Sequence, residues 1–129
     1  MPEVPVSWGE LVDKIAILEI KRERLTDAAA LANVRRELAS LERWQAELVA
    51  NARLGELKAS LAQVNRALWD VEDAIRAKEA RAEFDAEFVG LARSVYRQND
   101  RRAALKREIN LALASELIEE KSYPAYGDP

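Results

Sequence analysis

Polar side chains interrupt the apolar pattern of two expected helices at matching positions. Arg22 stands where the apolar face of the first helix would continue, and Arg102 does the same in the last helix. Counting outward from the expected turns places Glu19, Trp69 and Tyr96 in one layer of an antiparallel helix arrangement. The full set of candidate site residues is Glu19, Arg22, Asn65, Trp69, Glu72, Asp73, Arg76, Tyr96, Asn99, Arg102 and Lys106.

This polar layer has two interpretations. In the first, the polar groups fix the register of the helices, and Trp69 and Tyr96 each donate a hydrogen bond to a partner that satisfies them. In the second, the layer is a small cleft in which cations hold an anionic ligand and carboxylates orient it. The cations would be Arg22, Arg102 and Lys106, and the carboxylates Glu19 and Glu72.

Two kinds of catalysis are weaker alternatives. The adjacent acids Glu72 and Asp73 could join Glu116, Glu119 and Glu120 in binding Mg²⁺, as carboxylates do in all-helical nucleoside-triphosphate pyrophosphatases. A chorismate-mutase-like site needs only Arg, Lys, Glu and Gln, but the spacing of the basic residues does not reproduce that pattern. We therefore expect no metal site, no cofactor and no catalytic residue.

Composition excludes much of the remaining chemistry. The 129 residues contain no His and no Cys, which removes histidine bases, cysteine nucleophiles, disulfides and the usual zinc ligands. The net charge of -3 does not favour nucleic acid. Arg93, Arg97 and Arg101 form a basic stripe, but the seven acids of residues 70–87 lie alongside it in the expected hairpin, so we expect intramolecular pairing to absorb part of this charge and predict no nucleic-acid partner.

The elements that must position these residues are helices. All four prolines lie at positions 2, 5, 124 and 129, and good helix formers dominate the rest of the chain. Ser7, Thr26 or Asp27, and Asp85 can cap helix starts, and Ser7 has Glu10 at capping-box spacing. The apolar spacing predicts helices over residues 7–25, 27–49, 53–80 and 85–119, with a turn rather than a kink near residues 50–54.

The predicted fold class is all-α: one domain over residues 1–129, an antiparallel four-helix bundle with coiled-coil-like packing. Residues 1–6 form an N-terminal extension and residues 121–129 an extended C-terminal tail. No secretory signal or membrane span is visible, so we expect a cytoplasmic protein without membrane insertion. Long helices with heptad frames leave apolar surface uncovered, which predicts a homodimer or a helical protein partner.

Four segments resemble a family of small bacterial proteins of unknown function, often encoded among genes for glycosyltransferases and lipopolysaccharide assembly. These segments are residues 7–21, 68–76, 95–110 and 119–123. The family's polar motif residues fall on Asp13, Lys14, Glu19, Lys21, Trp69, Glu72, Asp73, Arg76, Asn99, Asp100, Arg102, Lys106, Asn110, Lys121 and Tyr123. The resemblance brings no catalytic role with it.

From these observations we expect a non-catalytic accessory or interaction protein of bacterial envelope-glycan (lipopolysaccharide) biosynthesis. The alternative is a small helical enzyme or binder that acts on an anionic or nucleotide-linked sugar. Under this alternative, the ligand of the cleft would be an anionic small molecule.

Overall fold

The computed structural model describes residues 1–49 and 51–113, and within them the chain is helical with no strand. The predicted all-α fold is therefore confirmed. The helices are α1 (Trp8–Arg24), α2 (Ala28–Ser40), α3 (Glu42–Val49), α4 (Ala52–Ala80) and α5 (Ala86–Ala112). The last part of the predicted 85–119 helix, residues 114–119, and the predicted tail at residues 121–129 lie outside the described residues.

Capping residues set the helix starts largely as the sequence predicted. The side chains of Ser7, Asp27 and Asp85 each accept a backbone N–H from the first turn of α1, α2 and α5. Glu10 does not complete the capping box, because its carboxylate pairs with Lys106 instead. Asn51 caps α4 from an extended conformation, so α3 and α4 are separate helices and not one kinked helix.

One predicted helix, over residues 27–49, is divided in two. Leu41 closes α2 with φ -106° and ψ 0°, and α3 starts at the next residue. Just before the break, the Ser40 hydroxyl donates a 2.6 Å hydrogen bond to the carbonyl oxygen of Glu37. Such back-bonding by serine weakens and bends helices, which gives a physical reason for the break at this position.

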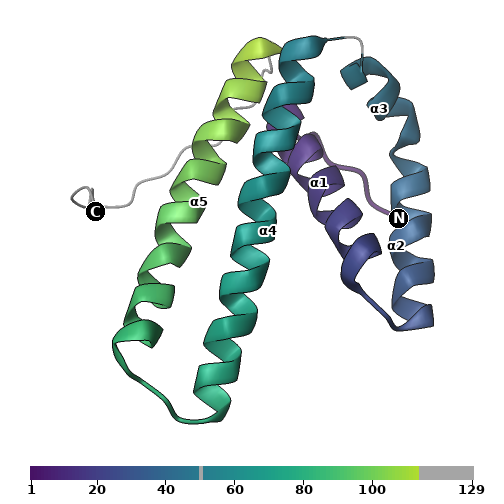
Figure 1. Ribbon diagram of the computed structural model, residues 1–129. Helices are drawn as coiled ribbons and strands as arrows, with labels where there is room; N and C mark the ends of the chain where they lie inside the picture. The colour runs from purple at the N-terminus through teal and green to yellow at the C-terminus, as the bar shows by residue number, and fades with distance from the viewer. Residues whose placement is uncertain (50, 114–129) are drawn as a thin grey trace.

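The helices pack in layers (Figure 1), and all five contribute residues to one apolar core. α4 and α5 form an antiparallel hairpin, α1 packs on both of them, and α2 packs on α1 and α3 without lying against α4 or α5. The finer prediction, an antiparallel four-helix bundle with coiled-coil-like packing, is not confirmed by the described helices. Only Val34 and Leu38 of α2 are buried, because its narrow apolar stripe is covered by α1 and α3 and not by the α4–α5 hairpin.

The apolar core lies in one half of the molecule. It consists of Val12, Ile15, Leu18, Val34, Leu38, Leu48, Leu54, Leu57, Leu61 and Ile109. The other end of the α4–α5 hairpin extends past the region that α1 contacts (Figure 1). No described helix is long and apolar enough to cross a membrane.

Candidate functional site

A cleft of about 630 Å³ opens where α1 meets the α4–α5 hairpin. The apolar residues Ile17, Ile20 and Leu68 line part of it. Its polar lining consists of Lys21 from α1, Asn65, Trp69, Glu72, Asp73 and Arg76 from α4, and Asn99 and Arg102 from α5. A concave site with an apolar part and a few converging polar groups is typical of small-molecule binding.

The buried carboxylate of Asp13 fixes one wall of this cleft. Its Oδ1 accepts hydrogen bonds from Asn65 Nδ2 and from Arg102 Nε, both at 2.9 Å, and its Oδ2 pairs with Arg102 Nη2. Asp13 is 3% exposed, so its charge depends on these donors. The network joins α1, α4 and α5, and it holds the Arg102 guanidinium in one orientation at the cleft.

A second junction ties α1 to α5 farther from the cleft. Lys106 pairs with Glu10, and the backbone N–H of Gly9 donates a 2.7 Å hydrogen bond to Asn110 Oδ1. A Cβ at position 9 would lie 2.5 Å from the Lys106 carbonyl oxygen, so only glycine permits this approach. The glycine therefore sets how closely α1 lies against α5, and with it the width of the cleft.

Lys21 is the cation of the cleft that no described carboxylate holds. Its side chain is half-buried, and no described acid lies within ion-pair distance of its ammonium group. The carboxylate of Glu37, for example, pairs with Lys14 at 2.7 Å and not with Lys21. A half-buried ammonium in a cleft favours an anionic group nearby.

Trp69 supplies the aromatic surface of the cleft. The Arg24 guanidinium lies 5.8 Å from the centre of its ring, and Arg24 is itself held by Asp70 at 2.6 Å. This cation–π contact and ion pair restrain the indole, whose surface lines the cleft together with Lys21 and Arg102. Such a surface packs well against a sugar or base ring.

Two carboxylates, those of Glu72 and Asp73, line the cleft. Glu72 and Arg76 are 3.9 Å apart one helical turn from each other, and Asp73 is exposed beside them. Among residues 1–49 and 51–113, no group of three or more acids could hold a metal ion. Glu116, Glu119 and Glu120, which the magnesium alternative required, lie outside the described residues.

A second hollow of about 380 Å³ continues along the outer face of α1. It shares Ile17, Lys21 and Arg102 with the first cleft, so these residues stand at the junction of the two. Carboxylates dominate the polar lining beyond that junction: Glu10, Asp13 and Glu37. Carboxylates accept hydrogen bonds from hydroxyl groups, and the junction cations attract anions.

The structure brings together most of the predicted candidate residues but not all of them. Asn65, Trp69, Glu72, Asp73, Arg76, Asn99 and Arg102 line the first cleft. Glu19, Arg22, Tyr96 and Lys106 do not line it. Glu19 pairs with Lys58 at 2.9 Å, Arg22 and Tyr96 are exposed, and Lys106 is buried against Glu10. The predicted roles of Arg22 and Lys106 as anion holders and of Glu19 as an orienting acid therefore do not apply to the lining of this cleft, and they stay predictions.

Two central residues were missed by the interpretation of the polar layer, namely Asp13 and Lys21. Both occupy polar motif positions of the resembled family, and that was the available signal. The apolar spacing gave no sign that Asp13 is central. Its position falls beside the apolar face of α1, where a charge is tolerated only when a group on another helix pairs with it.

The fold and the cleft define an all-helical protein with a cleft lined by both apolar and polar residues. Residues 2–127 match the model of a family of unknown function, DUF6165, and the chain belongs to that family. No curated protein and no solved structure matches the chain.

Proposed function

We propose that this protein is a non-catalytic accessory protein that acts by binding an anionic, ring-containing ligand in the cleft between α1, α4 and α5. The observation that supports this most strongly is the position of Lys21, an ammonium without a described counter-ion, in one cleft with Arg102 and the restrained ring of Trp69. A nucleotide-linked sugar has the required parts: a ring to pack on Trp69, phosphate for the cations, and hydroxyl groups for carboxylates.

The resemblance of four segments to the family found among glycosyltransferase genes supports a setting in bacterial envelope-glycan biosynthesis, in the cytoplasm, where activated sugars are used. Binding without turnover is supported by the composition, since a chain without His or Cys lacks the commonest general base and the strongest nucleophile. A homo-oligomer, or a complex with a helical partner, is the assembly we propose for it.

The test is a thermal-shift screen followed by calorimetry. The panel contains nucleotide sugars, sugar phosphates, free nucleotides and inorganic phosphate, each with and without Mg²⁺. A ligand at a hundred times its Kd stabilises the folded state by about 2.7 kcal/mol, which is a readily measured rise in Tm. We expect nucleotide sugars to give the largest shift.

Two variants test whether the ligand binds in the cleft. Lys21→Met removes the unpaired charge and Trp69→Leu removes the ring surface, so each should lower affinity by about tenfold or more. Arg35→Met is the matched control, because Arg35 is an exposed cation of α2 that lines neither hollow. Absence of any shift across the panel, or shifts that both cleft variants retain, would overturn the proposal. Release of phosphate or sugar during the incubation would show an enzyme instead of a binder.

A further inference from the structure

The first cleft and the second hollow adjoin along α1 and together make one groove. Ile17, Lys21 and Arg102 line both of them, so these residues form the boundary between the two compartments. On α1 the second hollow follows one stripe at steps of four, three and four residues, namely Glu10, Lys14, Ile17 and Lys21. At 1.5 Å per residue, this stripe is about 16.5 Å long. The groove thus offers two compartments on either side of a shared boundary.

The positive charge of the groove lies at this boundary. Of its two cations, Arg102 is paired with the Asp13 carboxylate, whereas Lys21 has no acid within ion-pair distance in the described part of the chain. The boundary therefore keeps a net positive charge between the two compartments. A diphosphate linkage carries negative charge and several acceptor oxygens, so its chemistry matches an ammonium and a guanidinium at this point.

Beyond the boundary, the charges of the second hollow are balanced. The Glu37 carboxylate pairs with Lys14 at 2.7 Å, and the Glu10 carboxylate pairs with Lys106. A carboxylate has about four lone-pair sites, so one ammonium leaves it able to accept further hydrogen bonds. Both carboxylates are about half exposed, at 45% and 47%, and a ligand in the hollow can reach them. This lining suits a neutral group with many hydroxyls better than a second anion.

We propose that the groove binds a nucleotide sugar in one direction, with the nucleoside in the first cleft and the sugar in the second hollow. The base packs on Trp69, and the diphosphate lies at the boundary with Lys21 and Arg102. The hydroxyl groups of the sugar donate hydrogen bonds to the carboxylates of Glu10 and Glu37. This inference deepens the proposed function and rests on it, since it assigns the second hollow to the same ligand.

Differences between the two compartments set this direction. The flat surface of Trp69 lines the first cleft, whereas none of the described residues that line the second hollow is aromatic. The side-chain amides of Asn65 and Asn99 also line the first cleft, and an amide offers both donors and acceptors to the edge of a base. The cleft of about 630 Å³ is larger than the hollow of about 380 Å³, and a nucleoside is larger than one sugar ring.

The first experiment measures by calorimetry how much the sugar adds to binding by the full chain. The probes are the diphosphates of uridine, guanosine, adenosine and thymidine, each compared with its own glucose ester. At least one ester should bind about tenfold more tightly than its parent diphosphate, although the parent has the greater negative charge. Diphosphates that bind as tightly as their esters would overturn this inference alone. No binding by any probe would overturn the proposed function with it.

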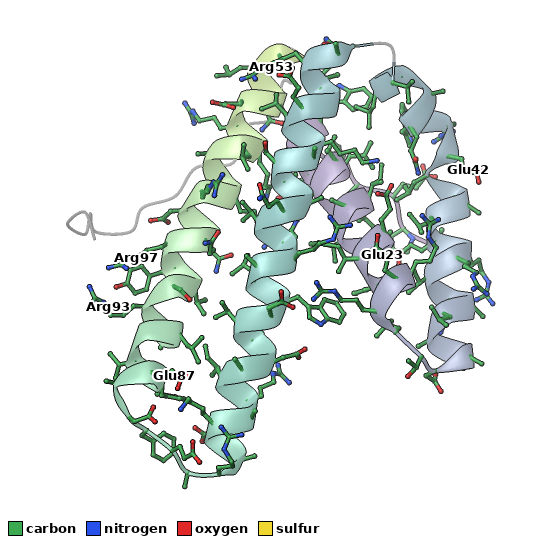
Figure 2. The ribbon with its side chains drawn as sticks, in the orientation of Figure 1. Glu23, Glu42, Arg53, Glu87, Arg93 and Arg97 are labelled. Atoms are coloured by element: carbon green, nitrogen blue, oxygen red, sulfur yellow. The ribbon has the colours of Figure 1, made fainter. Side chains whose placement is uncertain are left out.

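A charge-neutral double variant tests the second hollow itself. Lys14→Met with Glu37→Met removes a half-exposed ion pair that joins α1 to α2, and the preference for the ester should disappear. Glu23→Met with Arg66→Met is the matched control, because this pair also joins α1 to a neighbouring helix, at 3.0 Å, and lines neither compartment. Figure 2 labels Glu23 on α1. The control should keep the preference, and a test variant that also keeps it would overturn the inference.

The direction of binding is tested by NMR with the same probes. The parent diphosphate should shift the indole N–H signal of Trp69, which the Trp69→Leu variant identifies, and should leave the backbone amides of Val6 and Glu37 in place. The ester should shift all three signals, since Val6 and Glu37 line the second hollow. A diphosphate that shifts Val6 and Glu37, with Trp69 shifted by the ester alone, would overturn the proposed direction.

Discussion

Arg102 connects the stability of the protein to its cleft through a single carboxylate. Asp13 is almost completely buried, and two of its three described hydrogen bonds come from Arg102. A buried charge that loses its partner is costly, whereas replacing both members of a pair by apolar groups is often neutral. The polar layer that the sequence pointed to is therefore both a structural element and one wall of a site.

We expect Arg102→Met to lower the free energy of unfolding by about 3 kcal/mol, because it leaves the Asp13 carboxylate buried with Asn65 as its remaining described donor. The double variant Asp13→Leu with Arg102→Met should recover most of that loss, since no buried charge is left unpaired. Urea unfolding of the three proteins without ligand measures both effects. A single variant as stable as the wild type would show that the pair contributes nothing.

At the scale of the elements, the end of the α4–α5 hairpin formed by residues 70–80 and 86–96 is here called the arm, and its tip is stabilised by charge where it lacks an apolar core. The backbone N–H of Phe88 and the ammonium of Lys78 both hold the pKa of Asp85 below its usual value. Hydrogen bonding to Asp85 raises the pKa of Lys78 despite its burial. Beside them, the guanidinium of Arg81 lowers the pKa of Glu83.

These shifts set the direction of the arm's pH dependence. A carboxylate whose pKa is lowered by folding stabilises the folded state above its unfolded pKa, which is about 3.9 for Asp, and this stabilisation is lost as the pH falls through the lower folded value. The raised pKa of Lys78 has the opposite sign, so its contribution is lost only above about pH 10.4. The arm should therefore be stable through neutral pH and weaken in acid.

Asp85→Asn tests this directly, because asparagine still caps α5 but does not titrate. The variant should melt at a lower temperature than the wild type at pH 7, and the gap should shrink as the pH falls below 4. Circular dichroism melts between pH 7 and pH 3 give the comparison. A gap that stays constant over that range would contradict the role assigned to the charge of Asp85.

At the scale of the whole molecule, the core and the arm divide the hairpin into two regions of different stability. Ile15, Leu61 and Ile109 are fully buried where α1 covers the hairpin, while the arm beyond Asp70 has no fully buried apolar side chain. Local stability follows the density of buried apolar contacts. We expect the two regions to open separately.

Amide hydrogen exchange measures that difference. Amides of α1 and of the first half of α4 should exchange slowest, and those of the arm should exchange faster in dilute protein. Arm amides that exchange as slowly as those of α1 would show that the two regions open together.

Much of the local structure could be predicted from the sequence, and much of the packing could not. Ser7, Asp27 and Asp85 were identifiable as caps because a cap depends only on its own first turn. Counting levels from the turns placed Glu19 in the layer of Trp69, yet Glu19 reaches Lys58, a different level of α4. Level counting assumes straight neighbours of one bundle, whereas α1 packs on both helices of the hairpin and α2 packs on α1 and α3 but on neither α4 nor α5.

The same limit of level counting explains why only some of the predicted site residues line the cleft. Asn65, Trp69, Glu72 and Arg76 lie together in the cleft because their spacing places them on one stripe of α4, and Arg102 reaches the same cleft from α5. Lys21 joins them from α1, whose angle across the hairpin is set by the close approach at Gly9, a contact between residues 101 positions apart. No local pattern reports a contact over such a separation.

The contact between Gly9 and Asn110 affects how much of α1 is covered while the chain is being synthesised. α1 leaves the ribosome first, but the groups of α5 that cover it are translated about a hundred residues later. A long-range contact forms only once both of its segments have emerged from the ribosome. Until then Val12 and Ile15 have no α5 to pack against. A nascent chain interrupted before Asn110 thus presents the apolar face of α1 to chaperones and proteases, and the completed chain withdraws it.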